Sequence, residues 1–262
     1  MSKSSSVVAL AAATHPDDIE FMMAGTLLRL KDAGAEIHMW NLANGHCGTA
    51  SMPAAEIMAV RAAEAAASAA LAGAVSHPPL FNDLAIFYDQ PSLAKAGSVL
   101  RDIRPNIILT HSPNDYMEDH QNVCRLITTA AFARGMCNFI TDPPRPAWNA
   151  PVALYHALPH GLHDALGRQV TPDCWVDIAA ALDRKRAMLA CHQSQKEWLD
   201  ASQGMNAYLN EMERMSAEVA QICGARSFAE GWRRHSALGF CPADYNPMRE
   251  LLKGDYHGSS NQ

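Results

Sequence analysis

The stretch Ala11-Ala12-Ala13-Thr14-His15-Pro16-Asp17-Asp18-Ile19-Glu20 decides the fold, because the chain changes here from strand to helix. The apolar run over residues 7–13 predicts a buried strand, and the apolar spacing over residues 19–30 predicts a helix. The polar residues between them therefore follow the carboxyl end of a first strand, where open α/β sheets place their binding sites. A histidine and two carboxylates close together form a candidate metal and base cluster: His15, Asp17 and Asp18.

A helix start alone would explain part of this stretch. Asp17 followed three residues later by Glu20 resembles a capping box, and Pro16 keeps His15 out of the helical region. This alternative accounts for the proline, one aspartate and the glutamate. It leaves His15 and the second adjacent carboxylate unexplained, so we favour a functional site here.

Strands and helices alternate over the first half of the chain, which predicts a Rossmann-like, doubly wound α/β fold with a mostly parallel sheet. Further strands are expected at residues 36–43, 79–82, 106–110, 152–156 and 174–178, and helices at 18–33, 53–71, 91–103, 119–135, 179–192 and 205–221. No period is recognisable after residue 221. We expect a single domain over residues 1–262, with a core at about 7–195 and a helical and irregular C-terminal appendage at about 196–262.

The expected order of the strands determines which side chains meet. The second and third strands should lie on one side of the first strand, and the fourth strand on the other. A crevice then opens between the carboxyl ends of the first and fourth strands. His15 and Asp18 follow the first strand and His120 follows the fourth, so the fold would bring them together.

The composition argues against several classes of function. The chain has 262 residues, a net charge of −6 and no basic cluster, which argues against nucleic acid as the main partner. No apolar run is long enough for a membrane span and no signal peptide is recognisable, so we expect a cytoplasmic protein. Seven cysteines without a C-x-x-C pair indicate reduced, mostly buried thiols rather than a cysteine zinc site: Cys47, Cys124, Cys137, Cys174, Cys191, Cys223 and Cys241.

Two signatures carry a resemblance to a known family. His15-Pro16-Asp17-Asp18-x-Glu20 after a hydrophobic strand resembles the first signature of the PIG-L/LmbE-like family of zinc-dependent N-acetylglucosaminyl deacetylases. The family's second signature is an Asp-His at the start of a helix after a later strand, which Asp119-His120 matches. Arg61-x-x-Glu64-Ala65 and His192-Gln193-Ser194-Gln195 are similar to further family positions and follow in the same order.

The resemblance implies roles for individual residues. His15, Asp18 and His120 would bind Zn²⁺, although Fe²⁺ or another divalent metal also suits nitrogen and oxygen ligands. Asp17 would be the general base that takes a proton from the attacking water and hands it to the leaving amine. Asp119, next to a ligand, would belong to the catalytic group.

Three further residues have a structural alternative beside the functional one. Arg61 matches an arginine that contacts substrate in the family, but it could simply pair with Glu64 along a helix face. Asp83 follows a predicted strand and could accept hydrogen bonds from sugar hydroxyls, or could only cap a turn. His46 opens on the same edge as His15 and could be a ligand, but loop histidines are more often merely solvated.

One position departs from the family. Where family members often have His-Pro-Asp-His, this chain has Met117-Glu118-Asp119-His120, and a methionine donates no hydrogen bond. The missing histidine is thought to stabilise the oxyanion or protonate the leaving group. We expect His111 or Tyr116 from the same loop to replace it as a catalytic donor, with His235 as a further candidate.

The resemblance implies a metal-dependent hydrolase that removes an acetyl or other acyl group from an amide nitrogen, with a small amino-sugar-type substrate. It also suggests a homo-oligomer. Two alternatives stay open: an amidase acting on a sugar–thiol conjugate, and a zinc- and carbohydrate-binding module without turnover, which Met117 would permit. A nucleotide-binding Rossmann domain is disfavoured, because the chain lacks the G-x-G-x-x-G turn that holds a pyrophosphate.

Overall fold

The computed structural model describes residues 6–196 and 207–258, and over these residues the chain forms one eight-stranded sheet. The strands are β1 (Val8–Ala13), β2 (Glu36–Asn41), β3 (Val75–His77), β4 (Ile107–Thr110), β5 (Ala153–Ala157), β6 (Cys174–Asp177), β7 (Ala229–Arg234) and β8 (Tyr256–Gly258). Their order is β3-β2-β1-β4-β5-β7-β6-β8, parallel from β3 to β5 and antiparallel from β5 to β8. The expected α/β fold, with β1 between β2 and β4, is confirmed.

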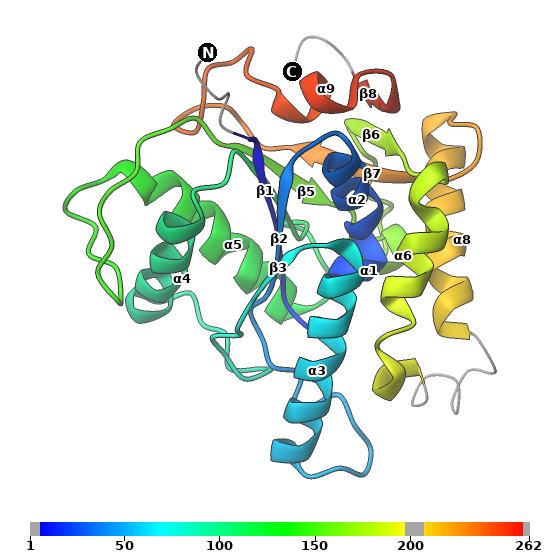
Figure 1. Cartoon of the computed structure of the whole chain (residues 1–262), viewed down its shortest axis with the longest axis horizontal. Coiled ribbons are helices and arrows are strands. Elements are labelled where there is room, and N and C mark those ends of the chain that lie inside the picture. Colours follow the sequence, from blue (N-terminus) through cyan, green and yellow to red (C-terminus); the bar gives the residue numbers. More distant parts are fainter. Residues whose placement is uncertain (1–5, 197–206, 259–262) are drawn as a thin grey trace.

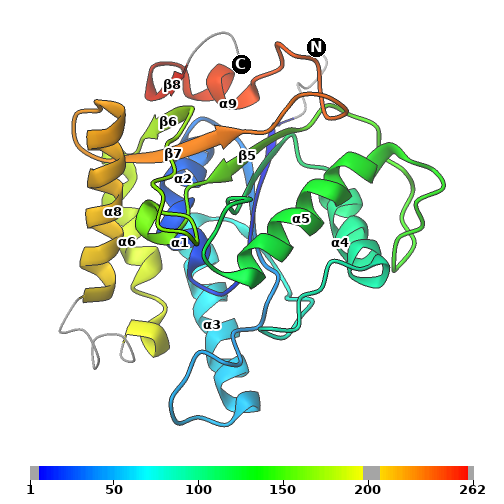
Figure 2. The same ribbon diagram turned by 180° about the vertical axis from the view of Figure 1, so that it is seen from behind.

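Helices cover both faces of this sheet (Figure 1), and the view from behind shows the same layers (Figure 2). One layer contains α4 (Gln90–Ile103) and α5 (Glu118–Phe132); the other contains α1 (Asp18–Met22), α2 (Ala24–Asp32), α3 (Ala54–Ala72), α6 (Leu182–Leu189) and α8 (Ala207–Cys223). The remaining helical segments among the described residues are α9 (Pro247–Leu252) and the 3₁₀ turns Ala133–Gly135, His160–Leu162, Ala179–Ala181 and Lys253–Asp255. The side chains of β1 alternate between the two faces of the sheet. Those on one face pack into one core cluster (Ala9, Ala11 and Ala13), and those on the other face pack into the second (Leu10 and Ala12).

The third strand lies earlier than the sequence predicted. It spans Val75–His77 instead of residues 79–82. Pro78 and Pro79 lack the N–H that a ladder needs, and the N–H groups of Leu80 and Phe81 both donate to the carbonyl of Leu42, at 2.9 Å each. The strand therefore ends at His77, and the pairing resumes only as an isolated parallel bridge between Ala43 and Phe81.

The first helix also differs from expectation, since the continuous helix predicted over residues 18–33 is divided into α1 and α2. Met23, between them, has φ −133° and ψ −21°, which is not a helical conformation. The division separates the short helix that follows the His15 turn from the longer helix that packs on the core.

The C-terminal region, predicted to be a helical and irregular appendage at about 196–262, contains helix α8 but also two strands that were not predicted. Strand β7 lies between β5 and β6, and β8 pairs with β6 at the edge. The strands of the C-terminal region therefore belong to the same sheet as β1 and do not form a separate appendage.

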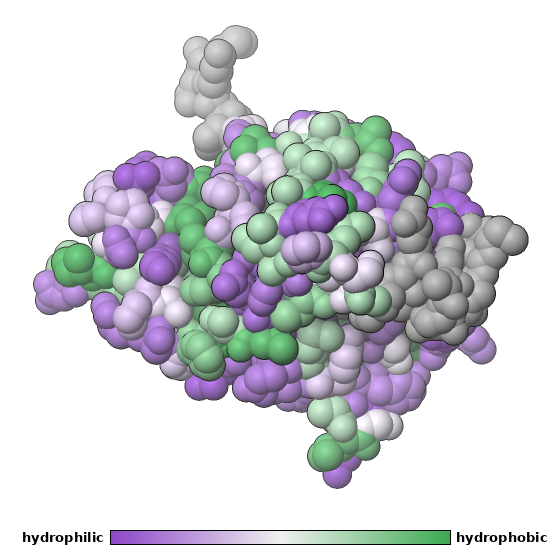
Figure 3. Space-filling model, turned by 90° about the horizontal axis from the view of Figure 1, so that it is seen from below, coloured by the Kyte–Doolittle hydropathy of each residue, from purple (hydrophilic) through white to green (hydrophobic). Residues whose placement is uncertain are grey.

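The burial of the cysteines differs from the expectation. All seven cysteines are free, but only Cys124 and Cys174 are buried, so the expectation of mostly buried thiols was wrong. None of the helices described here combines the length and the apolar character that crossing a membrane requires. On the face shown in Figure 3, hydrophobic residues lie in separate groups among hydrophilic ones.

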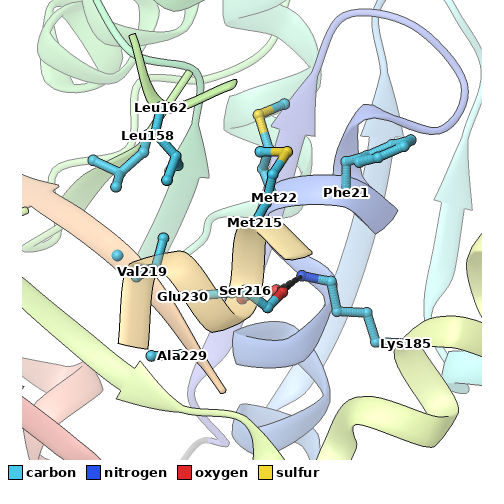
Figure 4. A pocket seen from close by; sticks show the side chains of 11 residues that line it. Phe21, Met22, Leu158, Leu162, Lys185, Met215, Ser216, Val219, Ala229 and Glu230 are labelled. Carbon is cyan, nitrogen blue, oxygen red and sulfur yellow. Dashed lines mark hydrogen bonds and ion pairs between the residues drawn. The ribbon is translucent and has the colours of Figure 1, made fainter. Parts of the chain in front are cut away.

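A buried ion pair connects β7 with the helical layer. Glu230 on β7 accepts hydrogen bonds from the backbone N–H groups of Gly25 (2.8 Å) and Thr26 (2.7 Å), in the first turn of α2. The Lys185 amine donates to Glu230 at 2.7 Å and to the Ser216 hydroxyl at 3.3 Å. Figure 4 shows the Lys185 amine directed at Ser216 and Glu230, beside a cavity of about 20 Å³. The glutamate is thus compensated by a cation and by a helix N-terminus.

Lys185→Met should destabilise the fold by about 3–5 kcal/mol, because it leaves the buried Glu230 carboxylate without its cation. The matched control is Arg184→Met on the same helix, since Arg184 pairs with Asp32 at the surface and such pairs contribute about 0–1 kcal/mol. Urea unfolding of both variants measures the difference. Equal losses of unfolding free energy would show that burial of the pair is unimportant.

Candidate active site

The turn after β1 has an unusual backbone conformation. Asp17 has φ 114° and ψ −24°, a region that residues other than glycine rarely adopt. Its side chain makes no capping hydrogen bond to α1, so the capping-box alternative does not describe this turn. Asn41 at the end of β2 fixes the turn from the side by donating to the carbonyl of His15 at 2.6 Å. This backbone strain is of the kind that clusters at functional sites.

Asp18 lies at the centre of three imidazole rings. Its Oδ2 is 3.5 Å from His15 Nδ1, 3.3 Å from His120 Nε2 and 3.5 Å from His111 Nε2. It also accepts a hydrogen bond from the backbone N–H of His15 at 2.7 Å. The adjacent carboxyl ends of β1 and β4 bring these groups together, as the expected strand order requires. Ligand atoms of His15, Asp18 and His120 all lie within 4.8 Å of one another.

His120 is arranged as a metal ligand would be. Its Nδ1 is 3.0 Å from Asp115 Oδ1, which orients the ring, and Asp115 is 1% exposed. Its buried Nε2 forms no hydrogen bond of normal geometry with any residue in the described part of the chain. A buried nitrogen without a hydrogen-bond partner, facing a carboxylate and a second histidine, fits a divalent metal bound by His15, Asp18 and His120.

The charges in this cluster support the same conclusion. Burial alone would raise the pKa of Asp18, but His120, His111 and His15 hold it well below its usual value. Burial would lower the pKa of His120, but Asp18 and Asp115 raise it to about 10. Asp119 and Asp18 likewise outweigh burial and raise the pKa of His15 to about 9. The carboxylates therefore favour positive charge at the place where a metal would bind.

Asp17 points away from this cluster. Its Oδ2 accepts a hydrogen bond from the Tyr208 hydroxyl at 2.7 Å, and its Oδ1 lies 3.4 Å from Arg61 Nη2. Burial raises the pKa of Asp17, although Arg61 opposes the shift. A carboxylate with a raised pKa is a stronger base, and this one is held by two side chains outside the ligand set. The geometry therefore separates Asp17 from the candidate metal ligands His15, Asp18 and His120.

Tyr208→Phe should lower kcat about 10–100-fold, because a hydrogen bond to a charged group contributes about 1.5–3 kcal/mol. The Tyr208 hydroxyl lowers the Asp17 pKa, so its removal should move the acidic limb of the pH–rate profile to higher pH. Tyr116→Phe is the control for the position of the acidic limb only, because it removes a pocket hydroxyl that makes no hydrogen bond to Asp17 among the described residues. An acidic limb that stays in place in Tyr208→Phe would contradict the role of Tyr208.

A pocket of about 380 Å³ opens beside the cluster. His15, Asp17 and Asp18 form one wall, and Tyr116 and His160 are among the residues of the remaining walls. Tyr116 packs edge-on against His120 with ring centroids 5.8 Å apart, and its centroid lies 6.4 Å from that of His160. Met117 also lines the pocket, so the position without a donor faces it.

The two predicted donors have different surroundings. His111 is 0% exposed, stacks on His120 at 4.0 Å and accepts a hydrogen bond from the Thr14 N–H. It therefore lies behind the ligands and not on the pocket wall, which does not favour it as a donor to substrate. Tyr116 is partly exposed and lines the pocket, so it stays the predicted donor.

Three further predicted residues, Arg61, Asp83 and Asp119, line the pocket. Asp119 lies 3.3 Å from His15 Nε2 and accepts from the Leu84 N–H at 2.8 Å. Arg61 is 3% exposed and bonds the carbonyl of Pro16, so it supports the turn as well as lining the pocket. Asp83 accepts from the backbone of the loop at residues 45–47.

Two functional positions were missed from the sequence, and one candidate lies elsewhere. Tyr208 reaches Asp17 from α8, 191 residues away, and no local motif marks it. His160 follows β5, and its place at the carboxyl end of a parallel strand was the signal that could have identified it. His235 contacts His156 instead, at 3.0 Å, outside this pocket.

Comparison with known proteins identifies relatives and solved structures of similar fold. The family model described as PIG-L: GlcNAc-PI de-N-acetylase matches residues 10–131. Diacetylchitobiose deacetylase from Thermococcus kodakarensis is 27% identical over 189 residues, which cover 69% of this chain and 67% of that protein. 4-Oxalmesaconate hydratase from Pseudomonas putida is 26% identical over 196 residues, covering 72% and 74%. The solved structure of N,N'-diacetylchitobiose deacetylase from Pyrococcus horikoshii superposes with a TM-score of 0.74 at 21% identity, covering 93% of this chain and 89% of that one.

Proposed function

We propose that the chain is a member of the PIG-L family, whose model matches residues 10–131, and that it is a zinc-dependent hydrolase that removes an acyl group from an amide nitrogen. The substrate class we propose is a small N-acetyl amino sugar or its conjugate. The observation that carries the proposal is that the two adjacent aspartates of the turn after β1 face different groups. Asp18 faces the histidines, whereas Asp17 faces Tyr208 and the pocket.

His15, Asp18 and His120 would hold the metal, and nitrogen and oxygen donors of this kind suit zinc. A bound divalent metal supplies Lewis acidity, which polarises the amide carbonyl and lowers the pKa of water. Asp115 would keep the His120 ring in place through Nδ1. Asp119 would orient His15 from the opposite side.

The remaining chemistry belongs to side chains on the pocket wall. Asp17 accepts a proton from the attacking water and returns it to the departing nitrogen, while Arg61 and Tyr208 hold its carboxylate. Tyr116 and His160 lie across the pocket and can donate hydrogen bonds to the developing oxyanion. They would supply the hydrogen bond that Met117 cannot donate.

A hydratase is the second candidate, and Met117 is the observation that favours it. Addition of water to a carbon–carbon double bond releases no amine, so that reaction does not need an acid beside a leaving nitrogen. One relative at 26% identity is a hydratase. The same metal ligands and the same base could serve either reaction, because both activate water.

The deciding assay supplies the zinc-loaded protein with two sets of compounds. Release of primary amine from a panel of N-acetyl amino sugars reports deacylation, and loss of conjugated absorbance from unsaturated carboxylates reports hydration. We expect amine release. Hydration without amine release would replace the proposal by the hydratase. Binding of the sugars without either reaction would favour the module without turnover.

A further inference from the structure

We propose that His46, Cys47 and Asp83 form a second metal site, which takes a thiophilic divalent cation such as Zn²⁺ at the wall of the catalytic pocket. One ligand atom from each residue lies within 4.8 Å of the other two. None of the three belongs to the His15, Asp18 and His120 set. The site brings together an imidazole, a thiol and a carboxylate, which are the three ligand types that zinc uses most.

Two of the three ligand pairs lie close to the spacing of a tetrahedral zinc site. His46 Nδ1 lies 3.8 Å from Cys47 Sγ and 3.8 Å from Asp83 Oδ2, and His46 Nε2 lies 3.5 Å from the same sulfur. Ligand atoms bound to one tetrahedral zinc at about 2.0–2.3 Å are about 3.3–3.7 Å apart. The third pair, the Cys47 sulfur and an Asp83 carboxylate oxygen, lies within 4.8 Å. His46 Nδ1 accepts a hydrogen bond from the Asp83 N–H at 3.2 Å, so binding through Nδ1 requires the imidazole to leave that N–H and turn its lone pair to the ion.

The backbone that carries these donors is already held in place. Asp83 Oδ1 accepts from the Gly45 N–H at 2.7 Å, and Oδ2 accepts from the Cys47 N–H at 2.9 Å. Gln195 holds Gly48, the residue after Cys47, by donating a hydrogen bond to its carbonyl at 2.7 Å. Each carboxylate oxygen keeps a further lone pair for a cation, so these bonds orient Asp83 without consuming it.

The surroundings of Cys47 favour a ligand over a nucleophile. Burial, together with the carboxylates of Asp83 and Asp119, raises the pKa of the Cys47 thiol. A reactive cysteine needs the opposite, a lowered pKa in an electropositive setting. A cation between the thiol and Asp83 would reverse this effect by displacing the thiol proton to solvent as it binds.

Occupancy should affect catalysis because the two sites are adjacent. Cys47 and Asp83 line the same pocket as His15, and Asp119 connects them by accepting from the Leu84 N–H and contacting His15. A cation at the second site would narrow the pocket. We therefore expect inhibition by zinc beyond one equivalent, a consequence that rests on the proposed hydrolase function.

The test uses cobalt, because thiolate coordination to Co²⁺ gives a charge-transfer band in the near ultraviolet, and His15, Asp18 and His120 contain no sulfur. Metal-free protein, reduced with a phosphine, is titrated with Co²⁺ alongside Cys47→Ser, Cys137→Ser and His120→Ala. Cys137 is the matched control, because it is also exposed and its sulfur contacts only Asn138 among the described hydrogen-bond partners.

The band should appear in wild type, in Cys137→Ser and in His120→Ala, and be absent in Cys47→Ser. His46→Gln should weaken the Co²⁺ affinity at the band by at least about tenfold, the lower end of the effect of substitutions around metal sites. A wild-type protein without the band, or a band that survives in Cys47→Ser, would overturn the second site. A charge-transfer band that is retained in His120→Ala would show that the cobalt is bound at the second site and not by the catalytic ligands.

The inhibition arm compares each variant with its own activity at one equivalent of zinc. Excess zinc should inhibit wild type and Cys137→Ser and should lose at least about tenfold in potency against Cys47→Ser. Equal inhibition of all three proteins would overturn the link between the second site and the pocket, while the cobalt band decides the site itself.

Discussion

Asp17→Asn is expected to lose about two to four orders of magnitude in turnover while keeping a full equivalent of metal, the range usual for a positioned acid–base group. The substitution removes the proton acceptor but keeps an oxygen that can accept from Tyr208, now at 2.7 Å. The fold should therefore be preserved. Asp17 is not among the side chains that converge on Asp18 Oδ2, so the ligand set should stay complete.

Metal analysis after gel filtration, together with turnover at saturating substrate, measures both parts of this result. Asp18→Asn is the control, because it alters a ligand directly beside Asp17 in the sequence and should lower the metal content. If Asp17→Asn lost the metal and Asp18→Asn retained it, the two aspartates would have exchanged roles.

His120→Ala should empty the metal site and reduce turnover to that of the metal-stripped protein. It removes the one ligand that comes from the β4 side, and His15 and Asp18 alone leave too few ligands for a stable site. It also leaves Asp115 buried without the imidazole that it now orients.

His160→Ala is the control for this experiment, because His160 lines the pocket outside the ligand set. It should retain metal and lose activity only through the missing donor. Metal content and thermal unfolding should be measured together, so that loss of the ion can be separated from loss of the fold. A full equivalent of metal in His120→Ala would exclude this histidine as a ligand.

Local pattern was sufficient for the parts of the molecule that depend on neighbours in the sequence. The apolar run before His15 predicted β1, and the alternation of strands and helices predicted the crevice where His120 meets Asp18. Both follow from periodicity and from the regular connection of parallel strands. The prolines at 78 and 79 show the limit, because their missing N–H groups moved the third strand although the residues after them are apolar.

Features that depend on distant partners could not be predicted in this way. The backbone conformation of Asp17 has no sequence signal, since an aspartate before a helix normally caps it. Tyr208 becomes a partner of Asp17 only when α8 packs against the turn. The position of β7 between β5 and β6 is likewise determined by long-range pairing, which a single-sequence pattern does not encode.

The bond between Glu230 and the first turn of α2 spans 205 residues, and it has a consequence for how the protein is made. At about 5–20 residues per second, a ribosome needs about 10–40 s to synthesise that length. Throughout this interval α2 lacks the acid that neutralises its N-terminus, and β5, once it is synthesised, lacks its antiparallel neighbour until β7 follows. A product that ends before β7 lacks both of these contacts, so it should be a substrate for chaperones and proteases.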